Sequence, residues 1–239
     1  MLLPDPLLSI IYPQACHLCG QSVEDHSDGV ACAACWSKTR IFDGSETLCD
    51  KCSAFLSEER RFSGPTFCRR CDEDHFDRAR AVGIYEDALY ASIINIKERP
   101  YLSRRLEQLI YRAFLDSPFA GTSKIIPVPL SFRRQRERGF NQAAMIAKSL
   151  GKKINVAVDE LSLARKIHTE RHRAGMDRKA RRETVKNAFE VKRPRLIDDE
   201  NILLVDDILT SGATVSNCAK VLKKAGAVEV NVLTIARAV

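Results

Sequence analysis

The sequence has 239 residues, of which 45% are hydrophobic, a composition that excludes a disordered chain and allows one packed core with a smaller appended module. No apolar run approaches the roughly 18 residues that a bilayer span needs, so a membrane-spanning protein is excluded as well. The net charge of +7 is uneven, because residues 131–195 hold 19 Lys and Arg against 7 Asp and Glu, a net charge of +12. We expect a soluble, cytoplasmic protein with a regional cationic surface suited to phosphates.

The first 16 residues interrupt their apolar side chains with prolines and Asp5, and they lack the basic region of a secretory signal. We predict a short packing helix here. Without an export signal the nine cysteines are expected to stay in a reducing compartment, which favours metal ligation over a disulfide framework.

Eight of the cysteines form four CxxC pairs, and the members are Cys16, Cys19, Cys32, Cys35, Cys49, Cys52, Cys68 and Cys71. Each CxxC turn points two thiolates at one ion, and two turns complete a tetrahedral sulfur shell around zinc. Redox pairs or disulfides are the weaker alternative. We favour ligation by neighbouring pairs, although an interleaved arrangement would use the same residues. Two closed, structural zinc sites are expected in a module of residues 1–76, followed by a second domain over residues 77–239.

The second domain shows alternating strand and helix patterns. Strands are expected at 79–85, 124–130, 201–208 and 228–239, helices at 86–96, 102–115, 140–150 and 213–226, and a weakly structured basic stretch at 165–195. This alternation predicts an α/β, Rossmann-like fold with a mainly parallel sheet and helices on both faces. Ligands of such sheets bind beyond the carboxyl ends of the strands.

Residues 202–214 read ILLVDDILTSGAT, so a buried strand delivers Asp206 and Asp207 to the sheet edge before a turn that opens a helix. The turn consists of small residues, which are Thr210, Ser211, Gly212, Ala213 and Thr214. Its backbone amides, its hydroxyls and the helix N-terminus suit a phosphate. The two carboxylates suit sugar hydroxyls or Mg²⁺. We therefore predict a site for a phosphorylated ribose; an ordinary strand end before a capped helix is the alternative.

Residues 125–147 read IIPVPLSFRRQRERGFNQAAMIA, which predicts a strand, a loop and a helix that begins near 139–141. The predicted loop carries Arg133, Arg134, Arg136 and Arg138. Guanidinium forks and backbone amides in this order suit a pyrophosphate, whereas a solvated turn is the alternative.

The 202–214 segment resembles the signature of the type I phosphoribosyltransferases, with Ser211 in place of a second Thr. Together with LLSIIYPQACHLCG, the CxxC pairs, IPVPL, RRQRERGFNQA and VKNAF, it makes nearly the whole chain similar to the ComF family. This family comprises competence-associated, phosphoribosyltransferase-like proteins and includes GntX-like members.

The resemblance implies a double zinc ribbon followed by a domain that binds phosphoribosyl pyrophosphate with Mg²⁺. It assigns the ribose and Mg²⁺ to Asp206 and Asp207, the 5′-phosphate to residues 210–214, and the pyrophosphate to Arg136, Arg138 and Gly139. A flexible loop within 165–189, with Arg173, Arg178 and Lys179, would close over the substrate. The family name further implies DNA uptake and transformation, with competence-machinery proteins as partners.

Two functions remain open on the sequence. In the first, the protein is a phosphoribosyltransferase-like enzyme that passes ribosyl phosphate to an unidentified nucleophile. In the second, it is a non-catalytic protein that binds a nucleotide or single-stranded DNA through the zinc module and the basic segment. Chemistry at the anomeric carbon needs no protein nucleophile, so no single residue reports turnover. The basic segment holds few aromatic residues, which limits base stacking.

Overall fold

The computed structural model describes residues 13–56, 65–166 and 187–239. The helix predicted at the N-terminus therefore lies mostly outside the described residues. Among the helices of the described part, none is long and apolar enough to cross a bilayer.

Four parallel strands form the central sheet in the order β1 (Ala79–Ile84), β6 (Glu229–Arg237), β5 (Asn201–Leu209) and β2 (Lys124–Pro127). Their carboxyl ends meet at one edge, where Pro127 pairs with Val205 and Leu209 pairs with Arg237. The predicted parallel sheet is thus confirmed, and all four predicted strands are present. β5 lies inside the sheet between β6 and β2, so its side chains are covered on both faces.

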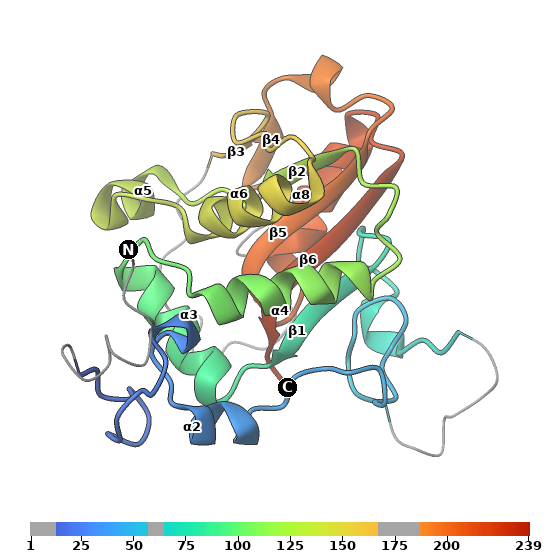
Figure 1. The fold of residues 1–239 in the computed structure, drawn as a ribbon. Helices are drawn as coiled ribbons and strands as arrows, with labels where there is room; N and C mark the ends of the chain where they lie inside the picture. The colour runs from blue at the N-terminus through green and yellow to red at the C-terminus, as the bar shows by residue number, and fades with distance from the viewer. Residues whose placement is uncertain (1–12, 57–64, 167–186) are drawn as a thin grey trace.

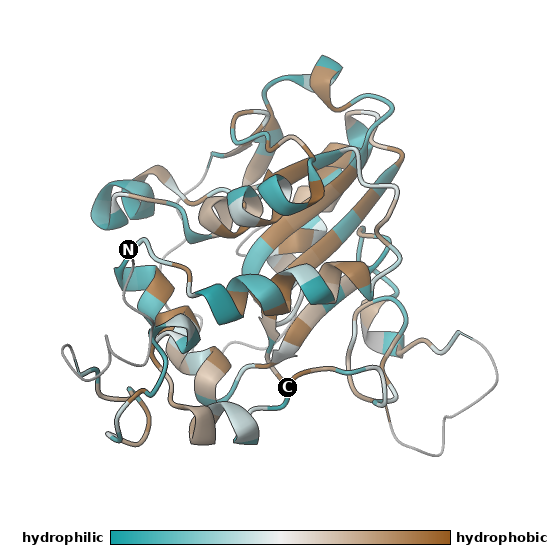
Figure 2. Ribbon diagram, in the orientation of Figure 1, coloured by the Kyte–Doolittle hydropathy of each residue, from teal (hydrophilic) through white to brown (hydrophobic). Residues whose placement is uncertain are grey.

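Side chains of the inner strands point alternately into two separate hydrophobic clusters, one on each face of the sheet. Leu203 and Val205 face the cluster that holds α3 (Asp87–Glu98), α4 (Arg104–Leu115) and α6 (Gln142–Ile154). Ile202 and Leu204 face the other cluster, together with α8 (Ala213–Lys224). Helices therefore cover both faces, as predicted (Figure 1). Figure 2 shows the strands largely hydrophobic, as strands covered on both faces must be.

The cysteine-rich segment packs on both faces of the sheet. The cluster with α3 includes Cys16, Cys32 and Trp36, the last of which lies on α2 (Ala33–Lys38). The cluster with α8 includes Cys49, Cys52, Cys68 and Cys71. Between them the chain runs along β1: Phe42 N–H donates to Val82 O at 2.9 Å. This contact covers an otherwise open sheet edge. The division into domains at residues 76 and 77 stays a prediction.

One expectation was wrong. The arginine-rich loop is a short helix, α5 (Phe132–Arg138), because Ser131 caps its start by accepting from the Arg134 amide and Gly139 ends it at φ 80°. At the two ends of the basic stretch, β3 (Leu163–Arg165) pairs antiparallel with β4 (Phe189–Val191), whereas residues 167–186 lie outside the described residues, so the weak structure expected there stays a prediction. A further short turn of 3-10 helix covers Pro194–Leu196. The helix predicted from about residue 140 is confirmed as α6, capped by Asn141.

Candidate functional site

A cleft of about 410 Å³ opens where the carboxyl ends of β2 and β5 meet. It lies where the sequence predicts ligand binding in a parallel sheet. Its polar lining consists of Lys97, Arg134, Arg138, Gln142, Arg165, Asp206, Asp207, Thr210, Gly212 and Thr214. Four of these lining residues are cations and two are acids, so the cleft suits an anionic ligand.

The two carboxylates stand side by side in the last part of β5. Asp207 is only 8% exposed, and its backbone amide donates to Asp206 Oδ1 at 2.9 Å. Burial, and then the negative charge of Asp207, raise the pKa of Asp206 well above its ordinary value. The pair therefore favours a bound proton, a cation or a hydrogen-bond donor beside Asp206.

Two partners of Asp207 were missed by the sequence reasoning. Lys97 Nζ, in the last turn of α3, lies 3.2 Å from Asp207 Oδ2, and Gln142 Nε2 donates to the same oxygen at 3.2 Å. Arg138 Nη1 donates in turn to Gln142 Oε1 at 2.9 Å. A chain of contacts thus joins α5, α6 and β5 beneath the cleft. A lysine in the last turn of a helix is ordinary, so the sequence offers no signal for Lys97.

The turn that the sequence predicts to bind a phosphate follows β5. Gly212 adopts φ 78° at the start of α8, a left-handed conformation that favours glycine. Thr210, Gly212 and Thr214 line the cleft, whereas Ser211 lines a neighbouring cavity and its Oγ accepts from the Ala213 amide at 3.4 Å. Three of the five predicted phosphate residues therefore face the same space as the two acids.

Only one of the three residues predicted to bind the pyrophosphate lines the cleft. Arg138 and Arg134 both line the cleft, but Arg136 and Gly139 are not among the cleft-lining residues. Arg133 pairs with Glu137 on the exposed side of α5 at 2.8 Å. Figure 2 shows α5 as a hydrophilic helix. The predicted loop residues Arg173, Arg178 and Lys179 lie outside the described residues. Arg165 of β3, which precedes this segment in sequence, lines the cleft.

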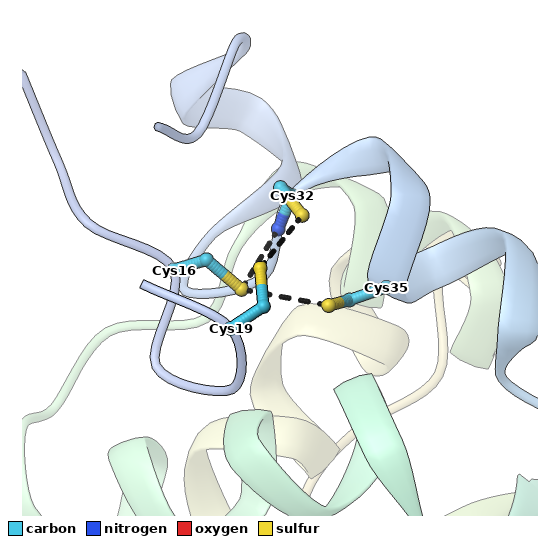
Figure 3. Close-up of side chains that lie close together, drawn as sticks. All are labelled: Cys16, Cys19, Cys32 and Cys35. Carbon is cyan, nitrogen blue, oxygen red and sulfur yellow. Dashed lines mark hydrogen bonds between the residues drawn. The ribbon is translucent and has the colours of Figure 1, made fainter. Parts of the chain in front are cut away.

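The first four cysteines converge on one point, as predicted for ligation by neighbouring pairs (Figure 3). The Sγ atoms of Cys16 and Cys35 lie 3.7 Å apart, and those of Cys19 and Cys32 lie 3.6 Å apart. A tetrahedral shell with Zn–S bonds of about 2.3 Å has edges of about 3.8 Å, so the thiols fit zinc. The Cys32 amide also donates to Cys16 Sγ at 3.4 Å.

The second four cysteines form an equivalent but fully buried cluster. Sγ distances are 3.6 Å for Cys49 with Cys71 and 3.5 Å for Cys52 with Cys68. A hydrogen bond from Cys52 lowers the pKa of Cys49 to about 4, against the effect of burial. Arg237 at the end of β6 contacts Cys52 Sγ at 3.9 Å. Each cluster fits one closed zinc site, and the interleaved pairing is excluded.

Comparison with known proteins matches two family models to the chain. A double zinc ribbon domain matches residues 7–72, and a phosphoribosyl transferase domain matches residues 137–238. Among solved structures, glutamine phosphoribosylpyrophosphate amidotransferase from Bacillus subtilis, complexed with ADP and GMP, is 15% identical with a TM-score of 0.36, over 62% of this chain and 26% of that chain. The two family models, together with the parallel sheet and the two cysteine clusters, define a phosphoribosyltransferase-fold protein with a double zinc ribbon.

Curated relatives extend over most of the chain. Competence protein F of Haemophilus influenzae is 30% identical over 87% of this chain and 90% of its own. DNA utilization protein YhgH of Escherichia coli K12 is 26% identical over 94% and 97%, and competence protein ComFC of Bacillus subtilis is 28% identical over 88% and 85%. The chain belongs to the ComF family.

Proposed function

We propose that the cleft binds phosphoribosyl pyrophosphate together with Mg²⁺. The observation that carries this proposal is that the paired acids of β5 and the Gly212 turn line one cleft. A ligand there needs a phosphate at one end and hydroxyls or a cation at the other, and a phosphorylated ribose has both.

The ribose end is assigned to Asp206 and Asp207. Carboxylate oxygens accept from vicinal hydroxyls, and they are the donors that Mg²⁺ prefers when phosphate oxygens complete its shell. Bound Mg²⁺ would neutralise charge on the pyrophosphate. Lys97 and Gln142 hold Asp207 in place, which leaves Asp206 as the acid with more freedom to meet the ligand.

The pyrophosphate is assigned to the arginine side of the cleft. Arg138 is anchored on Gln142, and Arg134 lies one helical turn before it on α5, so both guanidinium groups come from one element. Arginine binds phosphate oxygens through two parallel N–H groups, which gives orientation as well as charge. Arg136 and Gly139 remain assigned to the pyrophosphate by resemblance alone.

The biological setting is proposed from the relatives. Their names refer to competence and to DNA utilization, so we propose that this protein acts in the uptake or handling of DNA beside competence-machinery proteins. A cytoplasmic location stays a prediction. Binding of single-stranded DNA also stays a prediction, because much of the basic segment lies outside the described residues.

Isothermal titration calorimetry with phosphoribosyl pyrophosphate and Mg²⁺ tests the proposal. The double variant Asp206→Asn, Asp207→Asn should weaken binding by at least about a hundredfold, since two charge-assisted acceptors are lost. Asp198→Asn, Asp199→Asn is the matched control, because this neighbouring acid pair is exposed and lies before β5. Equal affinity of both double variants would exclude the proposed site.

Turnover needs its own assay. Release of pyrophosphate in the presence of a panel of nucleobases distinguishes a phosphoribosyltransferase from a binding protein. Release that depends on one base and on Asp206 would establish the enzyme. Binding without release under every base would support a sensor of phosphoribosyl pyrophosphate instead.

A further inference from the structure

The second cysteine cluster lies directly behind the phosphate turn. The segment Asp74 to Phe76 begins three residues after its last ligand, Cys71, and contacts the first turn of α8 through His75. A Cβ placed on Gly212 would lie 3.4 Å from Asp74 Oδ2 and 3.6 Å from Phe76 Cε1, so this segment packs against the back of the turn. The Gly212 turn is thus held between the cleft and the cysteine-rich segment.

Hydrogen bonds fix this segment at both ends. The His75 amide donates to Ser216 Oγ, in the first turn of α8, at 3.1 Å. On the cysteine side, the Asp74 amide donates to Cys71 O at 3.0 Å and Lys51 Nζ donates to Asp74 O at 2.8 Å. Lys51 lies between two ligands of the second cluster, Cys49 and Cys52. A short path of contacts therefore runs from the cysteine cluster to the turn.

Buried hydrophobic side chains also connect the second cysteine cluster with the turn. Phe76 is 1% exposed and shares one hydrophobic cluster with the four cysteines, Leu209 before the turn, and Val215 after it. Cys16 and Cys32 of the first cysteine cluster belong to the other hydrophobic cluster. Beside that cysteine cluster, Thr39 Oγ1 accepts a hydrogen bond from the Ala88 amide of α3 at 3.1 Å. Only the second cluster among the described residues shares its core with the phosphate turn.

We propose that the segment Asp74 to Phe76 is a positioning element for the phosphate turn, and that zinc bound by Cys49, Cys52, Cys68 and Cys71 sets its geometry. This inference rests on the proposed function for its ligand and concerns the 5′-phosphate end. Zinc bound to the first cluster has no such effect. The second zinc site is therefore coupled to ligand affinity, in addition to its role in folding.

Variants away from the cysteines test the positioning element first. Ser216→Ala removes the acceptor of the His75 amide and should weaken binding of phosphoribosyl pyrophosphate and of ribose 5-phosphate about fivefold, the effect of one hydrogen bond. Ser216→Thr keeps the hydroxyl and should restore the affinity. Binding of Mg²⁺ pyrophosphate, which lacks the 5′-phosphate, should stay unchanged. Thr39→Val removes the equivalent acceptor beside the first cluster and should leave all three ligands unaffected.

Cysteine variants then separate the two metal sites. Cys68→Ser and Cys19→Ser each lose one ligand, and mass spectrometry of the native protein reports the zinc content. Hydrogen–deuterium exchange over residues 209–217 should rise in Cys68→Ser and stay at the wild-type level in Cys19→Ser. This readout needs no ligand, so it decides the positioning role even if wild-type protein binds no phosphoribosyl pyrophosphate and the proposed function fails. Equal exchange in both variants, or equal loss of pyrophosphate and ribose 5-phosphate binding in Ser216→Ala, would overturn the proposal.

Discussion

Lys97 Nζ lies 3.2 Å from Asp207 Oδ2, so a helix that begins next to the zinc ribbon supplies the cation for an acid near the carboxyl end of the inner strand β5. Both side chains are largely buried, at 23% and 11% exposure, which strengthens their interaction relative to a surface pair. Lys97 thereby compensates part of the negative charge of the acid pair in the absence of a ligand.

Lys97→Met should lower the free energy of unfolding by about 1–2 kcal/mol, because it removes the cationic partner of a largely buried acid. Urea unfolding of the ligand-free protein measures this. The matched control is Arg78→Met, since Arg78 pairs with Glu229 on the exposed surface at 3.4 Å and should cost less than about 0.5 kcal/mol. Equal losses in both variants would contradict a buried pair.

The acid pair should oppose stability at neutral pH. A carboxyl whose pKa is raised on folding binds its proton more tightly in the folded state, so folding loses stability as pH rises from about 4 through the raised pKa of Asp206. Asp206→Asn mimics the protonated acid. We predict that it is more stable than wild type by about 1 kcal/mol or more at pH 7.5, with the difference falling toward pH 4. Urea unfolding at both pH values checks this, and a difference independent of pH would refute it.

Gly212→Ala should separate strain from function. A left-handed φ of 78° costs an L-residue about 1 kcal/mol, and the same cost applies to Gly44→Ala at φ 91° in the cysteine-rich segment. Thermal unfolding should report similar destabilisation for the two variants. Only Gly212→Ala should also weaken phosphoribosyl pyrophosphate binding, measured by calorimetry. Retained affinity would show that the turn does not hold the phosphate.

The two zinc ions should leave at different rates. Cys19 is exposed and Cys35 is partly exposed, whereas the four thiols of the second cluster are buried in the shared core. A colorimetric chelator should therefore release one zinc per chain quickly and the second at least about tenfold more slowly, since the second requires opening of the core. Cys19→Ser should remove the fast phase. A single phase of two ions would contradict this difference.

Much of the fold could be predicted because its elements follow simple periodic patterns. β5 and α8 are adjacent in sequence, so Asp206, Asp207 and the Gly212 turn were recognisable as one unit. α5 was misjudged because none of its side chains is buried and it shows no apolar periodicity, although Ser131 and Gly139 are readable caps. The strands β3 and β4 have three residues each, too few for an alternating pattern.

The contacts that complete the cleft could not be predicted from one sequence. Gln142 and Asp207 lie 65 residues apart in the sequence. Lys97 lies on α3, which follows β1, and β6 separates β1 from β5 in the sheet. The cysteine spacing likewise predicts two metal sites but not that they pack on opposite faces of the sheet. Such positions depend on tertiary packing, which no local pattern encodes. The ligand assignments of the individual cleft residues stay predictions.

A crystal structure of the protein with phosphoribosyl pyrophosphate and Mg²⁺ tests the central claim most directly. We predict the 5′-phosphate in the turn of residues 210–214, within about 3.2 Å of its backbone amides, and ribose hydroxyls on Asp206 and Asp207. The pyrophosphate should face Arg134 and Arg138. A ligand bound elsewhere, or a phosphate turn that stays empty at saturating ligand, would contradict the account.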